Sequence, residues 1–157
     1  MCRVRRHRYT AGLLLLGLLI MVKSLPAQVA TVAGPWMGTW NSPDGSVYTA
    51  IIELTRKPDG TVDGGISWTL KDTRRADLQP KVGLNGTEFV HGTFDARCRV
   101  LALVGYKLDD PNKILSLDRY ELILAINGGG LAGVTANDQG EGDTWTGILS
   151  LRRPAWR

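Results

Sequence analysis

Histidine and cysteine are scarce in this sequence, with two of each among its 157 residues. His7 and Cys2 lie close to the N-terminus, so His91 and Cys98 stand alone in the rest of the chain. One histidine excludes a metal site built on several histidines, and one cysteine excludes a disulfide within that part. We therefore expect no metal centre, no cofactor and no intramolecular disulfide, and we expect a domain that is stabilised by its apolar core.

The order of parts in residues 1–27 indicates a secretory leader. Residues 3–8 are basic, residues 11–22 form an apolar run, and residues 24–28 supply small side chains suited to cleavage. The apolar run is short for a helix that spans a bilayer, which favours a cleaved signal peptide over a retained anchor. We predict export, to a periplasm or out of the cell, with residues 28–34 as a short linker before the folded domain.

Acidic and basic residues are nearly balanced once this leader is set aside. The chain has 19 Lys and Arg against 15 Asp and Glu, but five of the basic residues and none of the acidic ones lie in residues 1–27. Removing the leader leaves 14 basic and 15 acidic residues, a formal net charge of −1. The basic character of the whole chain belongs to the targeting segment, so we expect no nucleic-acid partner.

Turn-forming residues divide the rest of the chain into short segments rich in Val, Ile, Thr, Trp and Tyr, the marks of strands. We predict eight strands, near residues 35–41, 47–55, 61–70, 87–94, 98–106, 118–126, 130–136 and 144–152. Residues 71–81 are charged and lack alternation, which predicts a loop or a single helical turn that Pro80 ends. The fold class is all-β, with one antiparallel meander barrel over residues 35–153 and a tail at residues 154–157; a β-sandwich is the alternative.

Alternation and the placement of glycine favour the barrel. In residues 61–70 the apolar face holds Val62, Gly64, Ile66, Trp68 and Leu70. In residues 119–126 it holds Tyr120, Leu122, Leu124 and Ile126. A glycine two residues from a large side chain recurs on such faces, at Gly38, Gly64, Gly92, Gly133 and Gly147. Because glycine weakens a strand unless the chain bends sharply, the repetition predicts strands that coil tightly around a closed barrel.

Residues 34–46, GPWMGTWNSPDGS, resemble the opening strand of lipocalin-like and avidin-like barrels. In those families an early Gly-x-Trp packs across the barrel floor, which implies that role for Trp36. The spacing from Trp40 to Ser46 is similar to the Trp-x-Asn-x-x-Gly-Ser of avidins. Ser42 stands where the avidin pattern places a biotin-contacting asparagine, and the later biotin-stacking tryptophans have no counterpart. The resemblance therefore implies the architecture, and of that family's ligand contacts it carries over only Ser46.

Cys98 is a candidate nucleophile and His91 is the base that could activate it, but the predicted strand register does not bring the two side chains together. A tight turn at residues 95–97 would set Phe94 opposite Cys98 and His91 opposite Leu101. By strand parity His91 and Cys98 then point to opposite faces, which removes the contact that activation of the thiol requires.

Carboxylates likewise form no convincing acid and base pair. Asp109 and Asp110 lie in a turn, while Asp118 and Glu121 flank a strand, so turn or surface roles explain all four. Residues 137–143 resemble a calcium loop in their alternating oxygen-bearing side chains, but Ile148 occupies the twelfth position, where a bidentate carboxylate is required. We favour a flexible polar hairpin there, and we expect that the protein is not an enzyme.

Aromatic residues give the better indication of function. All of the following fall on faces predicted to point inward: Trp36, Trp40, Tyr48, Trp68, Tyr120 and Trp145. An eight-stranded barrel has room for a solid core or for one small ligand, and an aromatic lining with a few polar groups suits an apolar molecule. The predicted ligand-binding residues are Trp40, Ser46, Tyr48, Trp68, Tyr120 and Trp145.

An apolar outer face is predicted where residues 98–106 are apolar on both sides. We expect the inner side to hold Cys98, Val100, Ala102 and Val104. Leu101 and Leu103 then point outward, beside Ile123, and form an interface that a homodimer or an envelope protein would bury. An outer-membrane barrel is disfavoured, because the other outer faces carry Thr, Asp and Ser where lipid requires apolar residues. We expect no membrane span after residue 27.

These observations predict an exported, non-enzymatic, lipocalin-like domain that binds a small apolar or aromatic ligand in its barrel. The alternative is an envelope interaction or structural module that acts through the apolar strand face at Leu101, Leu103 and Ile123.

Overall fold

The computed structural model describes residues 31–137 and 145–155, with the backbone alone at residue 145. Its strands are β1 (Gly34–Asn41), β2 (Val47–Arg56), β3 (Thr61–Asp72), β4 (Asn85–Asp95), β5 (Val100–Asp109), β6 (Asp118–Leu124), β7 (Gly130–Asn137) and β8 (Trp145–Arg152). One 3₁₀ turn, η1 (Gln79–Lys81), has Pro80 in its first turn, as expected for a segment that lacks alternation. The predicted leader lies outside the described residues, and so do residues 138–143 of the predicted calcium-like loop.

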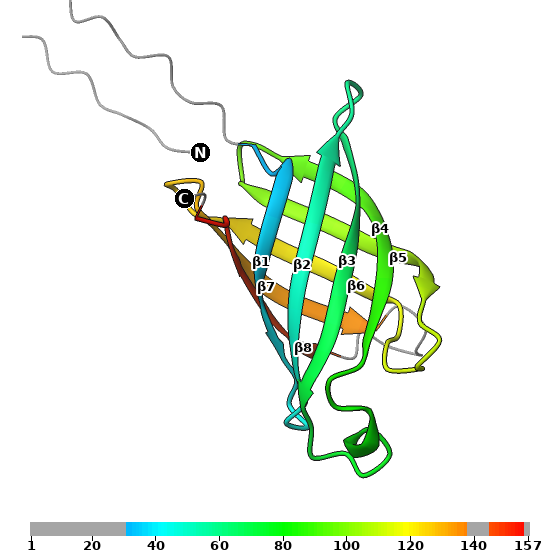
Figure 1. Cartoon of the computed structure of the whole chain (residues 1–157). Coiled ribbons are helices and arrows are strands. Elements are labelled where there is room, and N and C mark those ends of the chain that lie inside the picture. Colours follow the sequence, from blue (N-terminus) through cyan, green and yellow to red (C-terminus); the bar gives the residue numbers. More distant parts are fainter. Residues whose placement is uncertain (1–30, 138–144, 156–157) are drawn as a thin grey trace, which may run out of the picture.

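Each strand pairs antiparallel with the next one along the chain, and β8 pairs with β1 to close the sheet. Figure 1 shows the strands wrapping around a single interior, with the β2–β3 turn at one end and the β1–β2 turn at the other. The predicted all-β meander barrel is therefore confirmed, and the sandwich alternative is wrong. Closure removes the exposed sheet edges that an open sheet of this size would leave.

Alternating side chains fill the interior, as period-two strands require. On β2 the buried residues are Tyr48, Ala50, Ile52 and Leu54. On β6 they are Tyr120, Leu122 and Leu124, as predicted. Ile126, the fourth residue predicted on that inner face, is 94% exposed, because β6 ends at Leu124 and the chain turns before it reaches Ile126.

Trp36 closes one end of the barrel, which we call the floor. Its side chain has no exposed surface, and its indole Nε1 donates a hydrogen bond to the Val32 carbonyl at 2.8 Å. The Arg153 guanidinium lies 3.9 Å from the centre of the Trp36 ring and donates to the carbonyls of Ala33 at 2.7 Å and Thr31 at 2.9 Å. These contacts hold residues 31–33, the segment before β1, across the floor of the barrel. Trp36 itself lies at the floor, where the resemblance implied that it would be.

We expect Arg153→Ala to lower the free energy of unfolding by about 1–2 kcal/mol, because it removes a cation–π contact and frees carbonyls that the guanidinium now satisfies. Urea unfolding followed by circular dichroism measures the change. Arg152→Ala is the matched control, since this neighbouring arginine is exposed on the outer face, and we expect a change within about 0.5 kcal/mol. Equal effects of the two substitutions would contradict the role of Arg153.

The prediction of which β5 side chains point inward is wrong, because the strand is shifted by one residue from the expected register. Leu101 and Leu103 are buried, at 0% and 1% exposure, and Ala102 is exposed. The cause is the turn: the Asp95 carboxylate accepts the amide hydrogens of Arg97 at 2.7 Å and Cys98 at 3.2 Å, so the turn takes in residues 96–99 and β5 begins after it. A slip of one residue moves every side chain of a strand to the other face.

The observed register of β5 also changes the predicted positions of Cys98 and His91. Phe94 pairs with Leu101, not with Cys98, and His91 pairs with Val104. Cys98 is exposed in the turn, and the His91 ring lies on the outer face with its centroid 5.2 Å from that of Tyr106. Neither side chain therefore faces the barrel interior.

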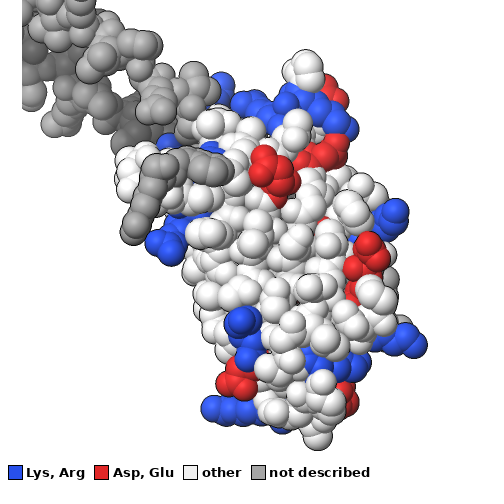
Figure 2. Space-filling view, in the orientation of Figure 1, with Lys and Arg blue, Asp and Glu red and all other residues white. Residues whose placement is uncertain are grey.

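Of the predicted interface residues, only Ile123 lies on the outer face, where it is 60% exposed. Figure 2 shows the charged side chains gathered toward the two ends of the molecule, with blue and red intermixed, while the middle of the visible wall is uncharged. Within residues 31–137 and 145–155, no helix is long and apolar enough to cross a membrane.

Candidate functional site

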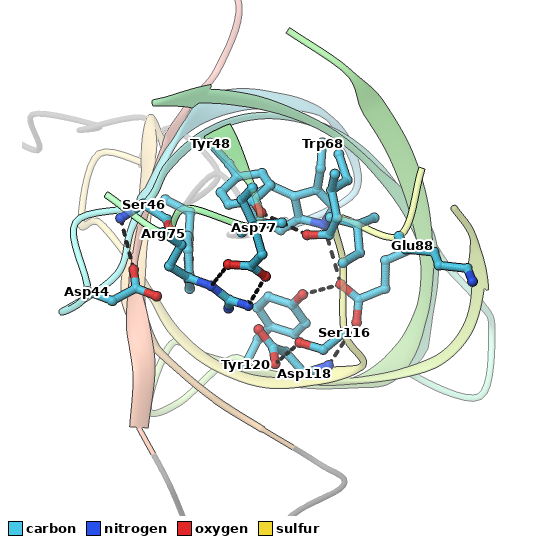
Figure 3. A pocket seen from close by; sticks show the side chains of 15 residues that line it. Asp44, Ser46, Tyr48, Trp68, Arg75, Asp77, Glu88, Ser116, Asp118 and Tyr120 are labelled. Carbon is cyan, nitrogen blue, oxygen red and sulfur yellow. Dashed lines mark hydrogen bonds and ion pairs between the residues drawn. The ribbon is translucent and has the colours of Figure 1, made fainter. Parts of the chain in front are cut away.

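A cavity of about 320 Å³ opens at the end of the barrel opposite Trp36, which we call the mouth. This volume lies near the lower end of the range of about 300–1,000 Å³ that is typical of small-molecule sites. The β1–β2 turn, the segment of residues 73–84 between β3 and β4, and the loop of residues 110–117 between β5 and β6 surround it (Figure 3). Strand ends and connecting loops thus build the site at the open end of the barrel.

Aromatic rings form one side of the cavity. The Tyr48 ring lies edge to face with both Trp40 and Trp68, with centroid distances of 5.5 and 6.2 Å and interplanar angles of 74° and 84°. The Trp40 Nε1 donates to the Thr135 hydroxyl at 2.8 Å, and the Tyr48 hydroxyl donates to the Ile114 carbonyl at 2.7 Å. Because these polar atoms are already bonded, the Trp40 and Tyr48 rings are held in place in the wall of the cavity.

Glu88 is the most buried charged residue of the site, at 1% exposure. Gly105 on the neighbouring strand makes room for it, since a Cβ atom there would lie 1.9 Å from the Glu88 carboxylate. The carboxylate accepts hydrogen bonds from the Tyr120 hydroxyl, from the Asp118 amide at 3.0 Å and from the Trp68 Nε1 at 3.4 Å. Burial raises the pKa of Glu88 to about 7, and these hydrogen bonds oppose part of the rise.

Asp118 brings a second carboxylate into the cavity, at the start of β6. Among the described residues, its oxygens accept hydrogen bonds from the Ser116 and Thr146 hydroxyls, both at 3.4 Å. Burial raises the pKa of Asp118 to about 6. Figure 3 shows Asp118 beside Tyr120, on the side of the cavity opposite Tyr48 and Trp68.

Charged side chains also stand at the rim. Arg75 and Asp77 form an ion pair at 2.7 Å, with both side chains more than half exposed. Asp44 in the β1–β2 turn accepts the Ser46 amide hydrogen at 2.9 Å, and the Ser46 hydroxyl shares a hydrogen bond of 2.8 Å with Thr73. These contacts tie the turn to the segment of residues 73–84, so the rim has a defined shape.

The structure brings most of the predicted ligand-binding residues together. Around the one cavity lie Trp40, Ser46, Tyr48, Trp68 and Tyr120. The side chain of Trp145 is outside the part of the chain that the structure describes. Ser46, which the avidin resemblance carried over, sits at the rim and is itself only 3% exposed.

Sequence reasoning missed the two inner carboxylates of the cavity, Glu88 and Asp118. The expectation that Asp118 has a turn or surface role is wrong, because its side chain lines the cavity. Glu88 was not singled out, although it alternates with Val90 and Phe94 on the inner face of β4. An acidic residue in phase with buried apolar ones is the signal that would have identified it.

Metal binding has no support in the described ranges, because no group of three or more His, Cys, Asp or Glu side chains there could hold an ion. The two inner carboxylates are engaged by hydrogen bonds to protein donors instead.

Comparison with known proteins identifies the architecture. No protein-family model matches the chain, and no match was found among curated proteins. Among solved structures, a redesigned beta barrel, mFAP0, bound to DFHBI, is 14% identical and aligns over 80% of this chain and 100% of that chain, with a TM-score of 0.56. Likeness at this identity shows the fold alone, a closed eight-stranded antiparallel barrel.

Proposed function

We propose that this protein is an exported, non-enzymatic binding protein that holds a small aromatic molecule in its mouth cavity. The observation that carries the proposal is the cavity of about 320 Å³ whose lining includes four aromatic side chains. These are Trp40, Tyr48, Trp68 and Tyr120. Concave sites with an aromatic wall and a few placed polar groups are the usual form of small-molecule sites.

The preorganised rings support binding over simple core packing. Trp40 and Tyr48 are fixed by hydrogen bonds to Thr135 and Ile114, so little side-chain freedom is lost when a ligand stacks on them. A barrel of similar fold, mFAP0, was solved bound to DFHBI, which supports the capacity of such an architecture for a small ligand.

The absence of catalysis and the export are parts of this proposal. His91 and Cys98 lie away from the interior, and the Glu88 carboxylate is engaged by three donors, which leaves it poorly suited to move a proton to a substrate. Export rests on the leader pattern of residues 1–27.

The alternative function, an interaction module that acts through Leu101, Leu103 and Ile123, has little support in the structure. Two of its three residues, Leu101 and Leu103, are core residues, and only Ile123 is exposed. We therefore put forward no second function.

Titration with the neutral aromatic probe N-phenyl-1-naphthylamine tests the proposal. We expect saturable binding, seen as a rise in probe fluorescence, and Trp68→Ala should weaken it about tenfold or more, because it removes a ring from the wall of the cavity. Tyr106→Ala is the control, since it removes an aromatic ring that is 54% exposed on the outer face.

Equal probe affinity of the two variants would contradict a site in the mouth. Because Trp68→Ala removes a core side chain, circular dichroism must show that the variant is folded. Ser116→Trp, a substitution at an exposed position on the lip of the cavity, offers a second route to a blocked site with the core intact. Native mass spectrometry of the protein from its exported fraction then identifies any ligand that it carries.

A further inference from the structure

We infer that the ligand is an organic cation, a small aromatic ammonium compound whose charged nitrogen pairs with the Asp118 carboxylate. The inference rests on the proposed function and specifies the chemical class of its ligand. Three properties of the mouth cavity carry it: an excess of negative charge, a carboxylate with spare acceptor capacity, and rings set at right angles to one another.

Negative charge dominates the lining of the cavity. Its acidic residues are Asp44, Asp77, Glu88 and Asp118, and its basic residues are Arg75 and Lys113. Arg75 is engaged by Asp77 at the rim and Lys113 is exposed, so the more buried ionisable groups are the carboxylates of Glu88 and Asp118. An anionic ligand would be repelled there, and a cation would be attracted more strongly than in bulk water, because the low local dielectric screens less.

Asp118 differs from Glu88 in the acceptor capacity that remains. Glu88 is surrounded by three donors, one of them the Asp118 amide at 3.0 Å. The two hydroxyl contacts that Asp118 makes within the described residues are both at 3.4 Å, beyond the usual range of about 2.5–3.0 Å for such bonds. An ionised carboxylate has about four acceptor positions, so Asp118 can take a charged donor from a ligand.

The rings supply the second half of a cation site. Tyr48 stands nearly perpendicular to Trp40 and Trp68, so the wall offers ring faces in different directions. A cation that lies over such faces is attracted by their π-electrons, which is the basis of aromatic cages for ammonium groups. A carboxylate on the opposite side of the cavity, as Figure 3 shows for Asp118, completes a site for a charged nitrogen joined to an aromatic body.

A neutral ligand would be at a disadvantage in the same cavity. It would shield Asp118 from solvent and leave a desolvated carboxylate without a counter-charge, which is costly. A cation pairs with that charge as solvent is excluded. The cavity therefore discriminates between isosteric ligands by charge.

Affinity for a cation should also follow the ionisation of the cavity. The titratable and charged groups that line the cavity together with Asp118 are Tyr48, Glu88, Tyr120, Asp44, Asp77, Arg75 and Lys113. Asp118 and Glu88 lose their protons as the pH rises through about 6 and about 7, whereas an alkylammonium ligand keeps its proton across that range. Cation affinity should accordingly be low at pH 5 and high at pH 8.

Calorimetric titration with three indole compounds of nearly equal shape tests the inference. These are tryptamine, a cation; tryptophol, which is neutral; and indole-3-propionate, an anion. At pH 8 we expect tryptamine to bind at least tenfold more tightly than tryptophol, and indole-3-propionate not to bind. In Asp118→Asn the tryptamine affinity should fall at least tenfold, while that for tryptophol should not fall, because the substitution removes the carboxylate that a neutral ligand leaves without a counter-charge. Asp109→Asn, which removes the same charge at an exposed position outside the cavity, should change neither.

The unaltered protein provides a second readout that no folding defect can obscure. Its tryptamine affinity should rise at least tenfold from pH 5 to pH 8, and its tryptophol affinity should not. If tryptophol or N-phenyl-1-naphthylamine binds and tryptamine binds no more tightly than tryptophol, the inferred ligand class is wrong and the proposed function stands. If none of these compounds binds, both are wrong.

Discussion

Gly92→Ala should lower the free energy of unfolding by about 3 kcal/mol or more, a large loss for a single added methyl group. Gly92 lies in the middle of β4, opposite Leu103 of β5. A Cβ atom there would meet the Ala102 carbonyl oxygen at 1.9 Å and the Leu103 Cα at 2.9 Å. Because both obstacles are backbone atoms, relief requires the two strands to separate and lose hydrogen bonds.

Thermal unfolding followed by circular dichroism measures this effect, and a loss of this size corresponds to a decrease in Tm of about 10 °C for a domain of this length. Gly65→Ala is the matched control, since the nearest atom to its added Cβ is the Thr87 Cγ2, at 3.9 Å. We expect that control to be neutral or to stabilise the barrel by about 0.5–1 kcal/mol, because alanine loses less entropy on folding. If both variants melt at the same temperature, the barrel does not depend on close strand approach at Gly92.

Raising the pH from 4.5 to 7 should lower the stability of the unliganded barrel, with about 3 kcal/mol of the loss from Glu88 alone. Burial raises the pKa of Glu88 from 4.5 to about 7 and that of Asp118 from 3.8 to about 6. Between the lower and the higher value the unfolded chain has lost the proton that the folded chain still holds. Stability is therefore fully present below about pH 4 and is lost as the pH rises through 6 and 7.

Urea unfolding at pH 4.5, 6 and 8 measures this dependence. Glu88→Gln should remove about 3 kcal/mol of the loss, because the amide has no charge to desolvate and the Tyr120 hydroxyl can rotate to accept from it. Glu121→Gln, on the outer face of β6, removes the same charge where it is exposed and serves as the control. An equal pH dependence in the Glu88→Gln variant and in the unaltered protein would show that Glu88 is not the source.

This pH dependence bears on function, because a buried carboxylate in a cavity lowers stability without improving the core. Glu88 also requires Gly105 as its neighbour, a second departure from the best packing of a barrel wall. Perturbed ionisable groups in clefts are concentrated at functional sites, which agrees with a ligand that makes use of the charge.

Local sequence patterns determined most of the strand architecture. Turn-forming residues predicted the strand order, and the observed boundaries of β1 to β8 lie within a few residues of those expected. Inward glycines predicted a closed barrel, and the close backbone approach at Gly38, Gly92 and Gly133 is the physical reason. These features are local, because strand period and turn chemistry act between residues close together along the chain.

Tertiary structure decided what the pattern left ambiguous. β5 is apolar on both faces, so nothing in its composition distinguishes the side of Leu101 from that of Ala102. The Asp95 turn makes that choice by setting the length of the connection, and one residue more or less exchanges core for surface. Interface residues predicted from parity alone were therefore wrong for Leu101 and Leu103.

Only part of the candidate site could be predicted from the sequence. Alternation placed Trp40, Tyr48, Trp68 and Tyr120 on inner faces, but whether such rings fill a core or line a cavity depends on the volume that the closed barrel encloses at its mouth. Glu88 on β4 and Asp118 on β6 are 30 residues apart in the sequence, and the structure joins them through a hydrogen bond between the Asp118 amide and the Glu88 carboxylate. Burial and pKa follow from that long-range proximity, which strand period by itself does not specify.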